Sequence, residues 1–347
     1  MNKSKSVKIS EKNEPLAIKS MKVVLDFLPE RAEKILKMRF GVINGHPATL
    51  EEIGKKYGIT RERVRQIIKE ALNKVKRKKV KSGASIEQEI KFAINKSNGI
   101  IREEKLLNQV SDNVKAQGAV KFFLKVIDGV NSRSASAEME KVFYVKDFDF
   151  SKWKDCKDIA KKILEKKNVS IPSDEIVKEI SAADANIEKS AILDYLDVCK
   201  EVKINNFGKW GMIQWSDITP KGTREKAFLV MKEHGEPLHF TNVAEFIDKY
   251  GLSKRKSHPQ TVHNELIKDT RFVLVGRGVY ALAEWGYKRG TVKDVLEEIF
   301  RESGQPMSRD EILNKVLSSR KVKKSTIMIN LNNFFVRVDK DRYAIKK

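Results

Sequence analysis

The chain has 347 residues and a formal net charge of +23, with 34% charged and 40% hydrophobic residues. The length allows several small domains, and the charge favours a nucleic acid as partner. An anionic membrane surface is disfavoured because no helical stretch has the strongly apolar, aromatic face of an interfacial helix. No run is long and apolar enough for a secretory or transmembrane segment, so we expect a cytoplasmic, nucleoid-associated protein.

The first segment, residues 1–15, is polar and Lys-rich. We expect it to be a disordered basic tail. A short helical run follows from Leu16 to Leu28 and opens a domain that we place at residues 16–81.

Residues 49–78 predict two helices joined by a tight turn. Thr49 and Glu52 have the spacing of a capping box, Gly58 supplies the positive φ of the turn, and Thr60 can cap the second helix. Apolar residues then recur at helical spacing and form one stripe: Val64, Ile67, Ile68, Ala71, Leu72 and Val75. This pattern indicates a helix-turn-helix.

The other face of the second helix begins with four long polar side chains, Arg61, Glu62, Arg65 and Gln66. Residues one turn apart project together, so these donors and acceptors leave the N-terminal end of the helix as a group. That is the end which a helix-turn-helix protein presents to base edges. We therefore predict that these four residues read DNA bases.

The segment LPERAEKILKMRFGVINGHPATLEEIGKKYGITRERVRQIIKEALNKVK, from Leu28, resembles region 4 of sigma-70 family transcription factors. The resemblance implies that the four residues read a promoter −35 element in the major groove. It also implies DNA backbone contacts from Arg39, Thr49 and Leu50, and a contact with the β-flap of core RNA polymerase. Sigma factors carry their −10 and core-docking segments upstream of region 4, where this sequence has only about 27 residues. We therefore expect something other than a complete initiation factor of the usual kind.

A basic run surrounds and follows the predicted reading face. Between Arg61 and Lys81 there are ten Lys or Arg residues against Glu62 and Glu70. A solubilising tail is one interpretation, but phosphate contact is favoured beside a recognition helix. We assign these residues to the DNA backbone: Arg63, Lys69, Lys76, Arg77, Lys78 and Lys79.

The remaining residues contain an internal repeat. The motifs IREEKLLNQV, IPSDEIVKEI, HFTNVAEFI and MSRDEILNKV recur about every 70 residues, each between a helical run and an alternating or aromatic strand pattern. Helix, short helix, third helix and hairpin make a winged helix. The predicted fold is thus mainly α, a helix-turn-helix followed by tandem winged helices on short linkers. We place the four units at residues 85–150, 153–219, 222–287 and 288–347.

The third unit carries GEPLHFTNVAEFI, HPQTVHNELIKD and RFVLVGRGVYALAEWGY, and it resembles the HARE-HTH domain. That resemblance implies a role around DNA or polymerase. Arg277, in the glycine turn of the hairpin, is either a wing residue on a DNA phosphate or a solvated turn residue. The first two units are more acidic and are either spacers or protein contacts. The segment near Ser132 is either a wing loop or a linker.

Cys156 and Cys199 are far apart and predict reduced, partly buried thiols. We find no zinc spacing, phosphate loop or nucleophile motif, and expect no enzyme activity, cofactor, metal or small-molecule substrate. The leading hypothesis is a sequence-specific, sigma-like transcription regulator that binds promoter-like double-stranded DNA and engages RNA polymerase. Two alternatives remain: a polymerase accessory subunit comparable to delta, or a DNA-targeting component of a restriction or defence system.

Overall fold

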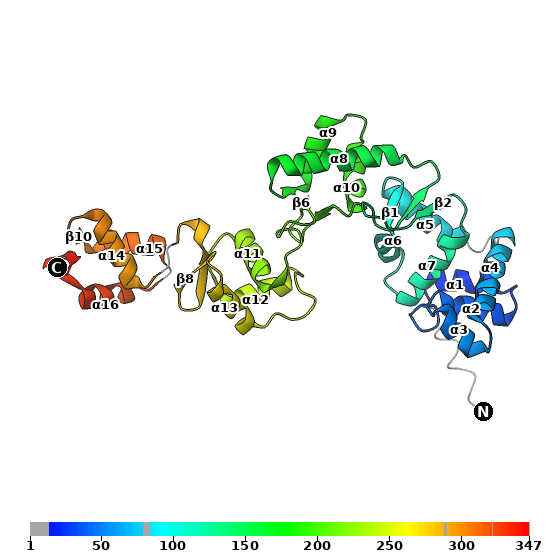
Figure 1. The fold of residues 1–347 in the computed structure, drawn as a ribbon, viewed down its shortest axis with the longest axis horizontal. Coiled ribbons are helices and arrows are strands. Elements are labelled where there is room, and N and C mark those ends of the chain that lie inside the picture. Colours follow the sequence, from blue (N-terminus) through cyan, green and yellow to red (C-terminus); the bar gives the residue numbers. More distant parts are fainter. Residues whose placement is uncertain (1–13, 79–83, 288–289, 321, 347) are drawn as a thin grey trace, which may run out of the picture. The chain divides into compact units, whose positions relative to one another are not determined.

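The computed structural model describes residues 14–78, 84–287, 290–320 and 322–346. The chain divides into two compact units at the boundary between Lys203 and Ile204, and each is described by itself. The fold is mainly helical with small three-stranded sheets, which confirms the predicted fold class (Figure 1). Among the described residues, no helix is both long and apolar enough to cross a membrane.

Four helices form the N-terminal helix-turn-helix region. The first two each begin after a proline, Pro15 and Pro29, whose fixed φ suits a helix start. Ile35, Ile53 and Val64 pack together beneath the pair that the sequence predicts. The helices are α1 (Leu16–Leu25), α2 (Glu30–Arg39), α3 (Leu50–Tyr57) and α4 (Arg61–Lys78).

Two repeats with the same order of elements follow. The first contains α5 (Ala84–Lys96), β1 (Ile100–Arg102), α6 (Glu103–Val110), α7 (Val114–Val126), β2 (Val130–Arg133) and β3 (Val142–Val145). The second contains α8 (Phe150–Lys167), β4 (Ile171–Pro172), α9 (Ser173–Ala183), α10 (Lys189–Asp197), β5 (Val202–Ile204) and β6 (Lys209–Met212).

The last two repeats keep the same order. The third contains α11 (Gly222–His234), β7 (Leu238–His239), α12 (Phe240–Lys249), α13 (Pro259–Lys268), β8 (Phe272–Gly276), β9 (Val279–Leu282) and a 3-10 turn, η2 (Ala283–Trp285). The fourth contains α14 (Val292–Ser303), β10 (Met307–Ser308), α15 (Arg309–Ser319), α16 (Lys324–Phe334), β11 (Phe335–Asp339) and β12 (Arg342–Ile345).

Every repeat forms one sheet in which its third strand lies between its first and second strands. This order, with three helices, is that of a winged helix. The short first strand of each repeat is missing from the sequence-based description, which assigned those residues to the start of a helix. β2 pairs antiparallel with β3, so the segment near Ser132 belongs to a wing.

The first repeat shares one hydrophobic core with the helix-turn-helix region. Met21 and Leu25 of α1 belong to the same buried cluster as Val120 and Phe123 of α7. Gly118 lets α7 approach closely, because a Cβ there would overlap the carbonyl oxygen of Phe40. These two parts are therefore joined by a core, unlike the separate units on linkers that the sequence suggested.

The second repeat packs on the wing of the first. Backbone bonds join Glu140 to Val198 and Lys200 to Glu138, each with an N to O distance of 2.9 Å. Lys157, only 3% exposed, lies 3.0 Å from the Glu138 carboxylate. The loop of the first wing is thus held by protein contacts.

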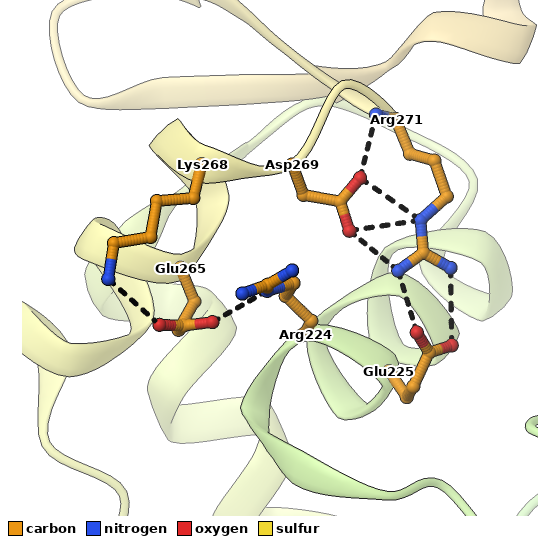
Figure 2. A network of polar contacts seen from close by, with 6 residues as sticks. All are labelled: Arg224, Glu225, Glu265, Lys268, Asp269 and Arg271. Carbon is orange, nitrogen blue, oxygen red and sulfur yellow. Dashed lines mark hydrogen bonds and ion pairs between the residues drawn. The ribbon is translucent and has the colours of Figure 1, made fainter.

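A network of charged residues closes the third repeat (Figure 2). The Arg271 guanidinium donates to the carboxylates of Glu225 in α11 and Asp269 after α13, both at 2.7 Å. Arg224 donates to Glu265 at 2.6 Å, and Lys268 lies 3.5 Å from the same carboxylate. The network ties the start of α11 to the end of α13 and to the strand that follows.

Candidate nucleic-acid interface

The turn between α3 and α4 is built as the sequence predicts. The Thr49 hydroxyl accepts from the Glu52 N–H at 3.2 Å, and the Glu52 carboxylate accepts from the Thr49 N–H at 2.7 Å. Gly58 adopts a left-handed conformation with φ of 63°. The Thr60 hydroxyl accepts from the Arg63 N–H at 3.2 Å, so it caps α4. These caps fix the angle at which α4 leaves the turn.

The four predicted base-reading residues all lie exposed in the first turns of α4. Glu62 and Arg65 form a two-pronged pair, with Nε to Oε2 at 2.8 Å and Nη2 to Oε1 at 2.6 Å. Gln66 donates to the same Glu62 carboxylate at 3.4 Å and accepts from Arg63 at 3.2 Å. The structure therefore joins Glu62, Arg65 and Gln66 into one surface cluster, with Arg61 exposed beside it.

The hydrogen bond from Arg65 holds the pKa of Glu62 below its ordinary value. Glu62 consequently stays ionised at neutral pH and keeps the guanidinium of Arg65 in place. The cluster offers forked donors, an amide and a carboxylate, which are the groups that distinguish base edges in the major groove.

The predicted backbone-contacting residues divide into two groups. Arg63 and Lys69 are exposed along α4, and Lys76, Arg77 and Lys78 are exposed at its C-terminal end. A helix of 18 residues is about 27 Å long, so the latter three lie about 20 Å from the reading cluster. Lys79 falls outside the described residues.

The other predicted contacts also have structural roles. Arg39 is half-buried and donates to the carbonyl oxygen of Ala48 at 2.9 Å, which holds the loop before α3. Leu50 packs against the small core beneath α3 and α4, while the Thr49 hydroxyl is used in the cap. What remains free by position is the first backbone N–H groups of α3, which favour an anion.

The third helices of the first two repeats face inward. In α7 the buried side chains include Val120, Phe122 and Phe123. In α10, Asp194 accepts from Asn98 at 2.7 Å and from Lys105 at 3.0 Å, and Asp197 accepts from Arg102 at 3.1 Å. Within the described part of residues 1–203, α4 is therefore the helix of this kind that presents a long polar face to solvent.

A groove lies on the helix-turn-helix region away from the reading cluster. It has a volume of about 240 Å³ and lies between α2 and α4. Ala32, Ile59 and Ile67 contribute apolar walls, and Arg31 and Lys74 stand at its edge. The sequence did not reveal this groove, because half-buried apolar residues on a helix look like ordinary core residues.

In the unit of residues 204–347, Arg277 is exposed at the tight turn between β8 and β9. Lys254, Arg255 and Lys256 are exposed in the loop before α13. These positions leave both interpretations of Arg277 open. Across the described residues, no cluster of His, Cys, Asp or Glu could hold a metal ion.

Comparison with known proteins agrees with these two regions. Residues 24–77 match the family model for sigma-70, region 4, and residues 223–285 match that for HARE-HTH, a restriction endonuclease HTH domain. A curated relative, the RNA polymerase sigma factor SigA of Bacillus sp, is 55% identical over 53 residues. That match covers 15% of this chain and 14% of the relative, so it concerns the helix-turn-helix region alone. Both resemblances noted from the sequence are thereby confirmed, and they support a DNA-binding, sigma-like character for this region.

Proposed function

We propose that this chain is a non-enzymatic transcription regulator of the cytoplasm and nucleoid, which reads a −35-like promoter element through α4. The observation that carries the proposal is the exposed cluster of Glu62, Arg65 and Gln66, with Arg61 beside it, at the capped start of α4. Side chains at this end of a recognition helix reach base edges in the major groove.

Reading requires Arg65 to exchange partners. An exposed ion pair is worth no more than about 1 kcal/mol, so the bond to Glu62 is given up easily when a guanine offers O6 and N7 to the guanidinium. Before binding, the pair limits the conformations of Arg65 and so reduces the entropy lost on contact. Glu62, once released, can accept from a cytosine amino group.

The backbone contacts come from residues around this cluster. Arg63, Lys69 and the exposed Lys76, Arg77 and Lys78 supply positive charge along one helix. The first N–H groups of α3, beginning at Leu50, face an anion favourably. These contacts are independent of sequence and fix the position of α4 in the groove.

We further propose that the groove between α2 and α4 receives an apolar ridge of core RNA polymerase, at its β-flap. A volume of about 240 Å³ accommodates one or two apolar side chains of a partner helix. Its separation from the reading cluster allows DNA and polymerase to be bound together. In the other unit, Arg277 and Lys254 to Lys256 supply further phosphate contacts.

Competition binding tests the DNA part of this proposal. A duplex containing a −35 element should bind at least tenfold more tightly than a scrambled duplex of the same composition. Affinity for both should fall steeply with salt, by roughly 10³–10⁵ between 50 and 200 mM for six to ten phosphate contacts. Equal binding of the two duplexes would exclude −35 reading, and a flat salt response would exclude DNA as the principal partner.

The polymerase part needs a separate experiment. Tagged protein should recover core RNA polymerase from a nuclease-treated lysate. Ile67→Glu places a charge in the groove wall and should abolish recovery, whereas Lys55→Glu, on the exposed face of α3, should not. If both variants recover polymerase equally, the groove is not the contact.

A further inference from the structure

In three of the four repeats, the outer face of the wing sheet is covered by an aromatic side chain from the segment that follows the last strand. In the first repeat, Tyr144 of β3 packs against Phe148 and Phe150, with ring centroids 6.3 and 4.9 Å apart. In the second, a Cβ on Gly211 of β6 would lie 2.8 Å from the Trp215 ring. Glycine is thus required there by the covering tryptophan.

The third repeat shows the complete cover. Val273 and Val275 of β8 and Ala281 of β9 are at most 2% exposed. Trp285 and Tyr287 pack on them. This face therefore becomes a small core of its own, separate from the core beneath the sheet.

The fourth repeat has the same sheet without the cover. β11 and β12 pair in the register of β8 and β9, and both pairs have a register shift at the equivalent position. Val336 and Val338 take the places of Val273 and Val275, yet they are 43% and 57% exposed. Among the described residues, nothing plays the part of Trp285 here.

The charge at this face also differs from that of the third repeat. Arg342 stands where the third repeat has Val279, which packs beside Trp285. Lys340 in the turn and Lys346 after β12 are exposed nearby. The valine pair is consequently surrounded by cations, and a segment that covers it gains from carrying acidic groups.

We propose that the outer face of β11 and β12 is a docking surface for a short acidic segment of a partner protein, with an aromatic side chain placed as Trp285 is placed in the third repeat. The aromatic ring covers Val336 and Val338, and a carboxylate meets Arg342 and Lys340. This inference is independent of DNA reading by α4.

The test uses the full chain and a labelled peptide, Ala-Glu-Trp-Gly-Tyr, which is the sequence of residues 283–287. Fluorescence anisotropy should show saturable binding at peptide concentrations up to the millimolar range. Val338→Glu should weaken it at least tenfold, because it removes apolar contact and repels the acidic peptide. Val169→Glu is the matched control, since Val169 is 56% exposed elsewhere in the chain, and it should leave binding unchanged.

Two altered peptides test the chemistry of the occupant. Replacing the tryptophan by alanine should abolish binding, and replacing the glutamate by lysine should weaken it at least threefold. The proposal is overturned if the wild-type chain shows no saturable binding, or if Val338→Glu and Val169→Glu behave alike. It is also overturned if Val338→Glu instead abolishes duplex DNA binding, or converts a dimer to a monomer in analytical ultracentrifugation, because DNA or a second copy would then be the occupant.

Discussion

Replacing Gly118 by alanine tests the core that joins the helix-turn-helix region to the first repeat. Gly118 lies within α7, where alanine is favoured over glycine by about 1 kcal/mol in an isolated helix. In this structure the added Cβ would overlap the carbonyl oxygen of Phe40 and lie 3.2 Å from its carbonyl carbon. The obstacle is backbone, so relief requires α7 to move away from Phe40.

Overpacking of this kind costs about 3 kcal/mol at the upper end of its usual range. After the helix-propensity gain is subtracted, Gly118→Ala should lower the free energy of unfolding by about 2 kcal/mol. For a unit of about 200 residues this lowers Tm by roughly 4–8 °C.

Differential scanning calorimetry of the full chain measures this shift. Lys125→Ala, at an exposed position of the same helix, is the control and should change stability by less than about 0.5 kcal/mol. If Gly118→Ala raises Tm, as helix propensity alone predicts, α7 does not pack against Phe40 and the shared core is refuted.

Two further predictions concern buried and paired groups. The hydrogen bond from Arg271 holds the pKa of Asp269 below its ordinary value, so its stabilisation is present above about pH 4 and is lost as pH falls through the lowered pKa. Asp269→Asn should therefore weaken hydrogen-exchange protection of β8 by about 1–3 kcal/mol at pH 7 and by much less near pH 2; a difference that does not change with pH would contradict this. Burial raises the pKa of both Cys156 and Cys199 to about 12, so a thiol reagent at pH 8 should react with neither in the native chain and with both in guanidinium, and rapid native labelling would show that these sites open.

The sequence predicted the elements whose signals are local. Thr49, Glu52 and Gly58 fix the turn through neighbours a few residues away, and the apolar stripe of α4 needs only helical periodicity. The four repeats were recognisable because each keeps the same apolar spacing. The exposure of the reading cluster follows from the same stripe, since the opposite face of an amphipathic helix meets solvent.

What the sequence could not provide depends on distant partners. β1, β4, β7 and β10 are two or three residues long and exist only through pairing with a strand about 40 residues later. The burial of α7 on both sides is hidden, because Ala116 and Gly118 suit a helix surface as well as a close contact. Asp194 likewise resembles a solvated acid until Lys105 and Asn98 are placed beside it.

The most direct test of the proposed function is the ratio of affinities for a −35 duplex and a scrambled duplex, measured by competition for two folded variants. Arg65→Ala with Gln66→Ala removes two base contacts worth about 1–3 kcal/mol each, and should reduce the ratio by one to several orders of magnitude. Affinity for the scrambled duplex should change much less.

Replacing Lys76, Arg77 and Lys78 by alanine is the matched control. It should weaken binding to both duplexes alike and lower the salt dependence, while the ratio stays constant. Circular dichroism first establishes that both variants are folded. A double variant of Arg65 and Gln66 that keeps the full ratio would contradict reading by α4 and place sequence recognition in the winged-helix repeats.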